Sequence, residues 1–454
     1  MPTTLLRTLP LFSALAAVGL AAAEPPVDWI DPDTGHRVIR LSTEPGSSTL
    51  YFHDNAYSAT GDKLIFHTPS GIALVDITKL GTEPPKSELV VTGGRSSYLA
   101  RRSREIYFVR GGGGRGRGGP AGPDNPTKAP TSGAATPPAG GRGGPSASEV
   151  FAYNFETKET RRIPYASRTL VNADETFALA TTVAEDPTGK TQPPPKKPYV
   201  PQMQRMFSGK KPEELTPEQI YAANKEDGLA RRTLDPRSEA FIFINLKTGA
   251  PSTVGYQYGS LNHMQFSPTD PNLLLYCHEG TWHEVDRVWT IRTDGSEMTL
   301  RHKRTMDMEI AGHEFWSHDG KTIWFDLQTP RSEKFWIAGV ELATGRQIRY
   351  PVERDAWSVH YNVSRDGKLF CGDGGDPTQV AFAKDGMWMN LFRPQPDGGM
   401  QREKLVNMAR HNYVTGRGGI EPNGSITPDG KWVVFSGDFD GARHVYAVEI
   451  AKAK

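Results

Sequence analysis

The sequence predicts an all-β fold, a seven-bladed β-propeller, because one short pattern recurs along the chain. A tight polar turn followed by a short apolar strand is found at residues 317–326, 364–373 and 427–436, and in a related form at 267–277. A weaker copy lies at residues 58–67. Repeats of about 40–60 residues that each contain several short strands are typical of β-propellers.

The less regular units bring the count to seven. Residues 96–110 and 148–163 form the second unit, and residues 169–183 begin the third. A further short strand, Val38 to Ser42, stands outside any complete unit. We expect it to pair with residues 444–450 and so to complete the last blade, because this closure removes an open sheet edge.

Two insertions interrupt the repeats. Residues 111–148 are rich in Gly, Arg and Pro and have almost no apolar side chains, so they cannot offset their ordering entropy and are predicted to be a disordered loop. Residues 185–237 begin Pro-rich and then turn helical, with Thr216 as the predicted cap and Pro217 at the first helical position. We expect this second insertion to lie over one face of the ring.

The first residues read as a secretory leader. Arg7 supplies a positive start, an apolar run follows from Leu9 to Leu20, and the small residues 21–23 suit a cleavage site. The apolar run is short for a membrane span. The expected mature chain is a single propeller domain, residues 24–454, that is periplasmic or secreted and is not held in a membrane once the leader has been removed.

The charge of the chain does not indicate a nucleic-acid or membrane partner, and its cysteine content does not indicate stabilisation by disulfides. The chain has 53 basic and 52 acidic residues, so no overall field points to nucleic acid or to a membrane surface. Its two cysteines, Cys277 and Cys371, each end the apolar strand of a different repeat. They are predicted to be buried free thiols, because equivalent positions of separate blades lie beyond disulfide reach.

Polar residues that precede the strand nearest the axis recur in four units. They are His263, His313, His360 and Glu421. A lone histidine before a strand is more often a satisfied structural group than a ligand. Because unrelated structural histidines would not share a position in the repeat, the recurrence favours one central pocket lined by metal-binding groups.

Several segments then resemble the oligogalacturonate lyases, a family of seven-bladed propeller polysaccharide lyases. The resemblance rests on CHEGTWHEVDRVWTIRTDGS, AGHEFWSHDG and SVHYNVSRDGKLFCGDG, and on the opening HRVIRLST and the closing PDGKWVVFSGDFDG. Members cleave uronic-acid linkages of small pectin fragments by β-elimination with the aid of manganese. The resemblance implies that His263 is the catalytic histidine and that His313 is a metal ligand.

The chain departs from the family pattern at two places. Where the family has a Gln-x-x-His-Pro-His-Pro-Ser metal-binding segment, this chain reads GGIEPNGS, which puts Gly418, Glu421 and Asn423 at the ligand positions. The family's catalytic arginine has no clean match in SEAFIFINLKTG, with Arg237 only nearby. The sequence leaves open whether the ion is Mn²⁺, a harder ion such as Ca²⁺, or absent.

If the reaction is a β-elimination, each candidate site residue has a hypothetical role in it. A neutral His263 takes the proton α to the carboxylate, with His278 as a second base. The cation at that carboxylate is Arg287 or a metal held by His313, His360, Glu421 and Asn423. The predicted substrate contacts are His53, Glu279, Trp282 and Trp316.

Three alternatives stay open. The tryptophans could instead pack between blades, and Asp286 could orient Arg287 or be a plain structural pair. The leading hypothesis is an exported lyase for uronic-acid oligosaccharides. The alternative is a non-catalytic TolB-like propeller that binds a protein or a glycan, and the oligomeric state is left open.

Overall fold

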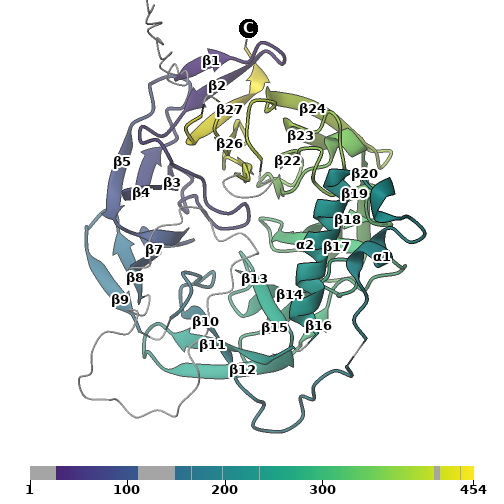
Figure 1. Ribbon diagram of the computed structural model, residues 1–454. Helices are drawn as coiled ribbons and strands as arrows, with labels where there is room; N and C mark the ends of the chain where they lie inside the picture. Colours follow the sequence, from purple (N-terminus) through teal and green to yellow (C-terminus); the bar gives the residue numbers. More distant parts are fainter. Residues whose placement is uncertain are drawn as a thin grey trace, which may run out of the picture.

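The chain folds into a ring of seven antiparallel sheets, as the computed structural model shows (Figure 1). The structure describes residues 27–453 except 111–148, 414–419 and the single residues 165, 197, 235 and 440. The predicted leader and the Gly/Arg/Pro-rich insertion therefore lie outside the described residues. The predicted seven-bladed propeller is confirmed.

The first three blades in chain order have the following strands. Blade 1 consists of β3 (Lys63–Thr68), β4 (Gly71–Asp76) and β5 (Ser87–Thr92). Blade 2 consists of β6 (Arg95–Leu99), β7 (Glu105–Arg110), β8 (Glu149–Asn154) and β9 (Thr160–Ile163). Blade 3 consists of β10 (Phe177–Val183), β11 (Ser238–Asn245) and β12 (Pro251–Tyr258). In blades 1 and 3, isolated bridges at Tyr57 and Val171 take the place of an innermost strand.

The next three blades have four strands each. Blade 4 consists of β13 (Ser260–Phe266), β14 (Leu273–Glu279), β15 (Val288–Arg292) and β16 (Thr299–Leu300). Blade 5 consists of β17 (Ile310–Trp316), β18 (Thr322–Gln328), β19 (Phe335–Glu341) and β20 (Gln347–Val352). Blade 6 consists of β21 (Tyr361–Val363), β22 (Phe370–Gly372), β23 (Trp388–Pro394) and β24 (Met400–Asn407), preceded by η2 (Arg354–Ala356).

Blade 7 joins the two ends of the described chain. It consists of β1 (Asp28–Ile30), β2 (His36–Arg40), β25 (Ser425–Ile426), β26 (Trp432–Gly437) and β27 (His444–Lys452). β2 pairs with β27, and Val38 lies opposite Val448. This pairing confirms that the early strand completes the last blade, which ties the ring shut without a disulfide.

The recurrent turn has one physical cause in blades 5, 6 and 7. A serine or threonine hydroxyl donates to the aspartate two residues later, and the same carboxylate accepts from the backbone of the lysine that follows the glycine. The glycine has a φ near +70° in all three copies, which a residue with a Cβ adopts only with strain. These copies are Ser317–Asp319–Gly320, Ser364–Asp366–Gly367 and Thr427–Asp429–Gly430.

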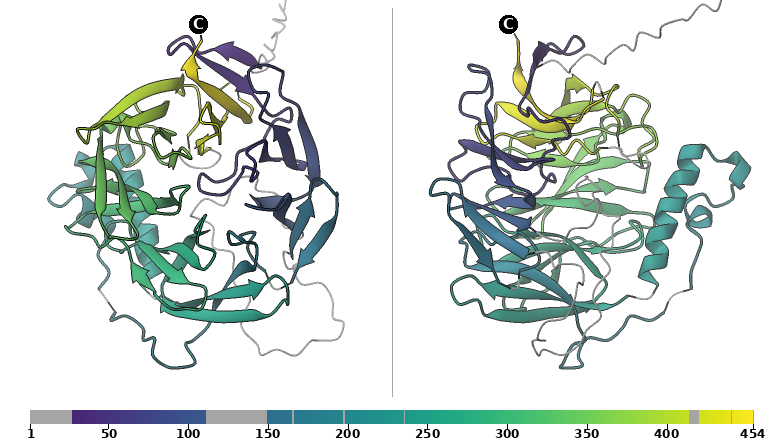
Figure 2. Two further views of the ribbon diagram at one scale, coloured as in Figure 1. Left: turned by 180° about the vertical axis from the view of Figure 1, so that it is seen from behind. Right: turned by 60° about the vertical axis from the view of Figure 1, so that its left-hand side comes forward.

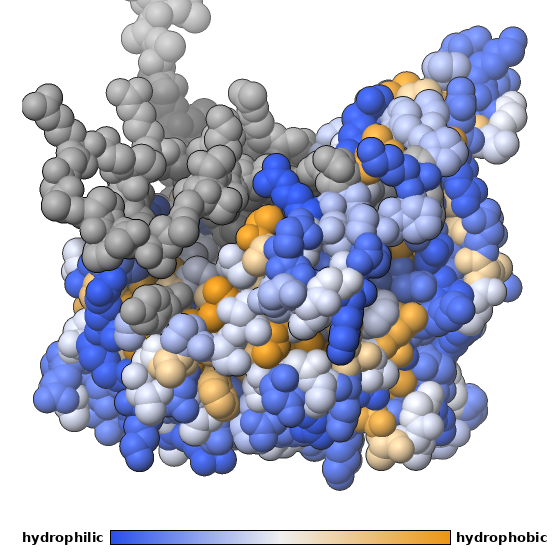
Figure 3. All heavy atoms as spheres, turned by 90° about the horizontal axis from the view of Figure 1, so that it is seen from below, coloured by the Kyte–Doolittle hydropathy of each residue, from blue (hydrophilic) through white to orange (hydrophobic). Residues whose placement is uncertain are grey.

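Apolar residues are buried where neighbouring sheets face each other. β26 is buried along its whole length, and β18 along all but its first residue. The cluster around Phe325 contains side chains from blades 4 and 5 together. Each fully buried large apolar side chain contributes roughly 1.5–3 kcal/mol, so packing between blades holds the ring together. Seen from below, the described surface is mostly hydrophilic with scattered apolar residues (Figure 3).

The second insertion forms helices on one face of the ring. They are α1 (Gln202–Met206), η1 (Pro212–Glu214) and α2 (Pro217–Thr233). Thr216 accepts from the backbone of Gln219 at 3.3 Å and Pro217 opens α2, which confirms the predicted helix start. α2 stands off the disc and runs in front of β17 and β18 (Figures 1 and 2).

Within the described residues, none of the helices combines the length and the apolar character needed to cross a membrane.

Candidate functional site

Two histidines reach the axis of the ring from equivalent bulges. The pairing of β13 with β14 shifts register between Asn262 and Gln265, and that of β17 with β18 shifts between Gly312 and Phe315. His263 and His313 occupy these irregularities with φ values of +48° and +52°. Left-handed backbone at non-glycine residues is uncommon and often marks functional positions, and a bulge changes the direction in which a side chain points.

Four imidazoles from different blades converge at this point. The ring centres of His263 and His313 lie 6.2 Å apart, and those of His313 and His360 lie 4.8 Å apart. His53, from the segment before β3, lies 5.7 Å from His263. The Tyr51 ring contacts His53, His263 and His360. The predicted meeting of histidines near the axis is confirmed.

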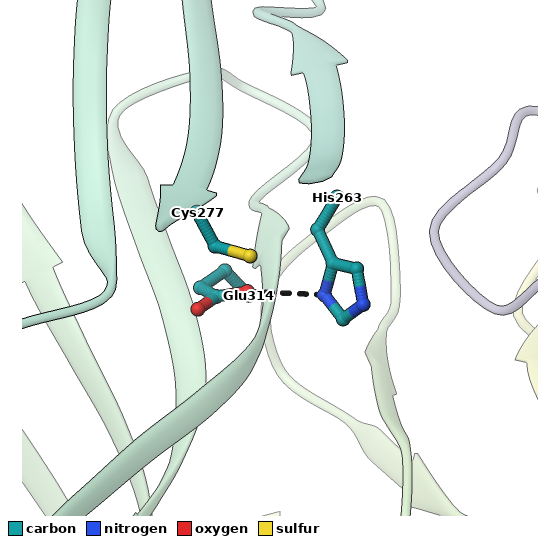
Figure 4. Close-up of side chains that lie close together, drawn as sticks. All are labelled: His263, Cys277 and Glu314. Carbon is teal, nitrogen blue, oxygen red and sulfur yellow. Dashed lines mark hydrogen bonds and ion pairs between the residues drawn. The ribbon is translucent and has the colours of Figure 1, made fainter. Parts of the chain in front are cut away.

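His263 belongs to a buried network with Glu314, Cys277 and Arg287, and Figure 4 shows the first three of these side chains. His263 Nδ1 lies 3.3 Å from Glu314 Oε2, and Arg287 Nε lies 3.6 Å from Glu314 Oε1. Arg287 also donates to Cys277 Sγ at 3.5 Å. Burial alone would raise the pKa of Glu314, but the hydrogen bond with His263 and the charge of Arg287 outweigh it and lower that pKa. Glu314 is therefore a carboxylate at neutral pH.

This network is a poor site for a metal ion. Among the described residues, His263, Cys277 and Glu314 form the one set of three metal-binding side chains whose ligand atoms all lie within 4.8 Å of one another. The guanidinium of Arg287 already compensates the charge of Glu314 and would repel a divalent cation. Burial also raises the pKa of Cys277 well above its usual value, which disfavours the thiolate that a metal requires.

Three of the predicted metal ligands, His313, His360 and Glu421, lie next to this network. His360 Nδ1 contacts Asp373 Oδ2 at 2.8 Å, and His360 Nε2 lies 3.8 Å from Glu421 Oε2. His360 Nε2 and His313 Nδ1 are buried without a hydrogen-bond partner among the described residues. Two free imidazole nitrogens beside one carboxylate are a donor set for a divalent transition-metal ion. In donor type, His313, His360 and Glu421 therefore fit an ion such as Mn²⁺, but their ligand atoms do not all lie within 4.8 Å of one another, so the three side chains would have to move closer together to bind it.

The pKa values of His313 and His360 shift in opposite directions. Burial, followed by the neighbouring His360 and His263, lowers the pKa of His313 well below 6.5, so its ring is neutral. Burial would also lower the pKa of His360, but the carboxylate of Asp373 outweighs it and raises that pKa. Asp373 orients the imidazole of His360 in the way that carboxylates orient metal-binding histidines.

The structure does not support the predicted role of Asn423 as a metal ligand. Its Oδ1 accepts from the backbone of Phe52 at 3.2 Å, and its Nδ2 donates to the carbonyl of Glu421 at 3.0 Å. Both ends of the amide are therefore engaged by backbone. Asn423 shapes the turn that presents Glu421, while Gly418, which stands at another ligand position of the family segment, lies outside the described residues.

Trp282 and Arg287 lie together at the site. The guanidinium carbon of Arg287 lies 4.0 Å from the Trp282 ring centre, and the indole is 4.9 Å from the His313 ring. Arg287 is buried, and its Nε and Nη1 have no hydrogen-bond partner among the described residues. Of the two interpretations left open for Asp286, the structure favours a structural pair, because Asp286 accepts from the backbone and side chain of Arg304 and not from Arg287.

Two predicted site residues lie elsewhere. His278 Nε2 bonds to Gln257 Oε1 at 2.7 Å, and its ring packs on Trp289. It follows Cys277 in β14, so strand alternation turns it away from the network. Trp316 packs in the core between blades 4 and 5, which favours its packing interpretation.

The two remaining predicted contacts lie close to the network. Glu279 accepts from Asn262 at 3.2 Å on the same face of β14 as Cys277, and its charge acts on Arg287. Both ring nitrogens of His53 are buried without a hydrogen-bond partner among the described residues, and Nδ1 lies 3.5 Å from Asp54.

Sequence reasoning missed Glu314, Tyr51 and Asp373. Glu314 follows His313 directly, Tyr51 stands two residues before His53, and Asp373 lies in the segment SVHYNVSRDGKLFCGDG. A carboxylate beside a recurrent histidine was the available signal.

Part of the chain that contains this site matches known proteins in sequence. Residues 235–454 match the family model described as oligogalacturonate lyase. The chain is 31% identical over 222 residues to the oligogalacturonate lyase of Dickeya dadantii, covering 46% of this chain and 55% of that protein. The C-terminal half is therefore similar in sequence to oligogalacturonate lyases. The oligogalacturonide lyase of Pectobacterium atrosepticum is 29% identical over 231 residues, with the same coverage.

The likeness in fold to a solved oligogalacturonate lyase extends over most of the chain. A solved oligogalacturonate lyase in complex with manganese superimposes with a TM-score of 0.65 and 18% identity, covering 94% of this chain and 96% of that one. In sequence, the chain spans about half the length of the curated relatives that it matches. His263, Arg287, His313, His360 and Glu421 all lie in the half related to these lyases, whereas α1 and α2 precede it.

Proposed function

We propose that the protein is a lyase that cleaves oligogalacturonates or closely related acidic oligosaccharides by β-elimination. One observation carries the proposal: the pair His263–Glu314 lies next to His313, and His360 and Glu421 lie beside His313. A base and a set of metal-binding groups are thus close enough to act on one sugar. The relationship of residues 235–454 to oligogalacturonate lyases supports the same reaction class.

The base in this proposal is His263. When Nδ1–H donates to the carboxylate of Glu314, Nε2 on the other side of the ring keeps its lone pair. Nε2 removes the proton from the carbon α to the uronate carboxylate. The electron pair forms the carbon–carbon double bond and expels the glycosidic oxygen, which takes up a proton.

Positive charge at the substrate carboxylate lowers the barrier, because negative charge develops there as the proton leaves. His313, His360 and Glu421 would hold the ion, which we propose to be Mn²⁺, with Ca²⁺ as the alternative for a more oxygen-rich ligand set. When bound, the ion supplies Lewis-acid charge at the carboxylate. The unpaired Nη1 of Arg287 is the second cationic group within reach of the network.

The test is an assay with purified protein and oligogalacturonates, with and without added Mn²⁺, that follows the ultraviolet absorbance of the unsaturated product. We expect product formation that requires His263 and that a chelator reduces. Metal analysis of the purified protein should find a divalent ion, and less of it in Glu421→Gln. Tight glycan binding without turnover, insensitive to chelators, would instead support a TolB-like binding propeller.

We also propose that the protein acts in the periplasm or outside the cell. The leader-like pattern of Arg7 and the apolar run up to Leu20 supports export. Mass measurement of the protein purified from its own cells should give a chain that begins near residue 24. A full-length chain recovered from the cytoplasm would contradict this part of the proposal.

A further inference from the structure

A buried carboxylate of the insertion holds the loop that carries Trp282. Glu226 of α2 is 3% exposed, and its Oε2 accepts from the backbone N–H of Trp282 at 3.3 Å. Its Oε1 pairs at 2.8 Å with Arg331, which lies between β18 and β19. A buried carboxylate costs free energy unless it is paired and hydrogen-bonded. Glu226 therefore keeps α2, the loop and blade 5 in one fixed arrangement.

The insertion contacts the same loop at two further places. Thr233 lies about two turns after Glu226 on α2, and a Cβ at Gly280 would be 3.0 Å from Cγ2 of Thr233. Gln202, at the start of α1, places its Oε1 3.0 Å from Nε2 of the buried His283. Buried polar groups that find their partners in this way favour one arrangement over others. Contacts from both helices thus hold the loop before and after the tryptophan.

The indole of Trp282 links this loop to the candidate site. The guanidinium carbon of Arg287 lies 4.0 Å from the Trp282 ring centre, and the ring centre of His313 lies 4.9 Å from it. α2 runs in front of β17, the strand that carries His313 (Figure 1). A guanidinium over an indole is held by cation–π attraction, which acts only while the ring keeps its place. If the Trp282 backbone moves, the indole therefore leaves both Arg287 and His313.

We propose that Glu226 is a positioning residue for the reaction: it fixes the backbone of Trp282 and so keeps the indole on Arg287 and beside His313. The inference rests on the proposed lyase function and deepens it, because it makes α2 part of the site. In this role Glu226 itself touches neither the sugar nor the reacting atoms. Arg287 acts on the negative charge that develops as the proton leaves, so its displacement should lower kcat more than it raises KM.

The test compares two double variants that differ in one hydrogen-bond acceptor. Glu226→Gln/Arg331→Met removes both charges but keeps an oxygen for the Trp282 N–H, whereas Glu226→Met/Arg331→Met has a side chain of similar size without that oxygen. On an oligogalacturonate trimer, kcat of the first should exceed kcat of the second at least roughly tenfold, because a small displacement in a site costs a large factor in rate. KM should differ by less than about threefold.

The positioning role also predicts that this difference disappears without the indole. With Trp282→Ala added to both double variants, their kcat values should be equal. A residue that only stabilises the fold would give the same ratio with or without the indole, so a ratio that persists would overturn the inference. The control is Glu213→Gln, which changes an exposed carboxylate of the same insertion and should have the kcat of wild type.

Urea unfolding shows whether each variant is folded at the assay temperature. If Glu226→Met/Arg331→Met is not, Gly280→Ala takes its place, because its Cβ would press on Thr233 and move the loop while Glu226 stays. Its kcat should then be at least roughly tenfold below that of wild type. An unchanged kcat in folded Gly280→Ala would overturn the inference.

The result also separates this inference from the lyase function. Equal kcat values of the two double variants, with active wild type, would overturn the role of Glu226 and leave the lyase function standing. If wild type forms no unsaturated product, the lyase function fails, and near-ultraviolet circular dichroism then decides whether Glu226 positions Trp282. The difference between wild type and Trp282→Ala gives the signal of this indole. Loss of that signal in Glu226→Met/Arg331→Met alone supports the positioning, and equal spectra of the two double variants overturn it.

Discussion

His263 Nδ1 lies 3.3 Å from Glu314 Oε2, although the two residues belong to inner strands of different blades. Gln265 reinforces this link, since its Nε2 donates to the carbonyl of Glu314 at 2.6 Å. The neighbouring inner strands β13 and β17 are thus joined by polar contacts directly at the axis. The orientation of the proposed base depends on the packing of blade 4 against blade 5.

Replacement of Glu314 by Gln should lower kcat by roughly 10- to 100-fold, and His263→Gln by at least about 100-fold. Glu314→Gln removes the negative charge that stabilises the protonated form of His263, whereas His263→Gln removes the base itself. Initial rates of the increase in product absorbance, measured at saturating substrate, give kcat. Urea unfolding of each variant shows whether a loss of activity is due to a loss of stability. Glu297→Gln, which breaks an exposed pair with Arg292, is the control. Full kcat in Glu314→Gln would show that His263 acts without its partner.

Gly312→Ala should displace Trp282 and reduce activity without unfolding the ring. A Cβ at position 312 would lie 1.9 Å from Cζ3 of the Trp282 indole, so the ring must leave its place on Arg287 and beside His313. We expect kcat/KM to fall at least roughly tenfold, which corresponds to about 1.4 kcal/mol, and the tryptophan emission to shift. Gly228→Ala is the contrast, because it meets no atom within 4 Å and should stabilise α2 by about 1 kcal/mol. Unchanged activity in Gly312→Ala would separate Trp282 from catalysis.

The propeller was predictable because each recurrent turn is determined by residues that are close together in sequence. Hydroxyl, aspartate and glycine stand at fixed spacing in each copy, and the hydrogen bonds between them close the turn without help from distant residues. The same spacing put His263 and His313 in phase, so their meeting at the axis followed from the fold. Closure by Val38 beside Val448 followed from the lack of any other partner for the early strand.

The remainder of the site was not predictable because it depends on bulges. In a regular strand, Glu314 would point away from the side to which His313 points, but the register shift between Gly312 and Phe315 brings both to the axis region. No local sequence pattern predicts the register shift between Gly312 and Phe315. His278 shows the opposite case: it stands beside Cys277 in sequence, and plain alternation in β14 sends it to Gln257.

Neither cysteine should react in the folded protein. Cys277 and Cys371 are free and fully buried, and burial raises the pKa of both thiols, which keeps them protonated. Because the thiolate is the reactive form, a chromogenic thiol reagent should titrate no groups in native protein and two in denaturant. The urea midpoint should not change with added reductant. A reductant-sensitive midpoint would indicate a disulfide, contrary to the prediction from separate blades.

His67 should make the stability of the ring depend on pH. The residue is half-buried in blade 1, where Nε2 accepts from the backbone N–H of Ser97 at 3.3 Å, and desolvation lowers its pKa from 6.5 to about 4. The unfolded chain therefore binds a proton between these two values that the folded chain does not, so this stability is present above pH 6.5 and is lost as pH falls toward 4. His67→Gln should remove up to about 1.4 kcal/mol per pH unit from the slope of the unfolding free energy in this window. Ser97→Ala keeps the imidazole and should keep the slope, even though it lowers stability. Urea unfolding at several pH values measures all three proteins, and equal slopes for wild type and His67→Gln would mean that His67 is protonated in the folded state.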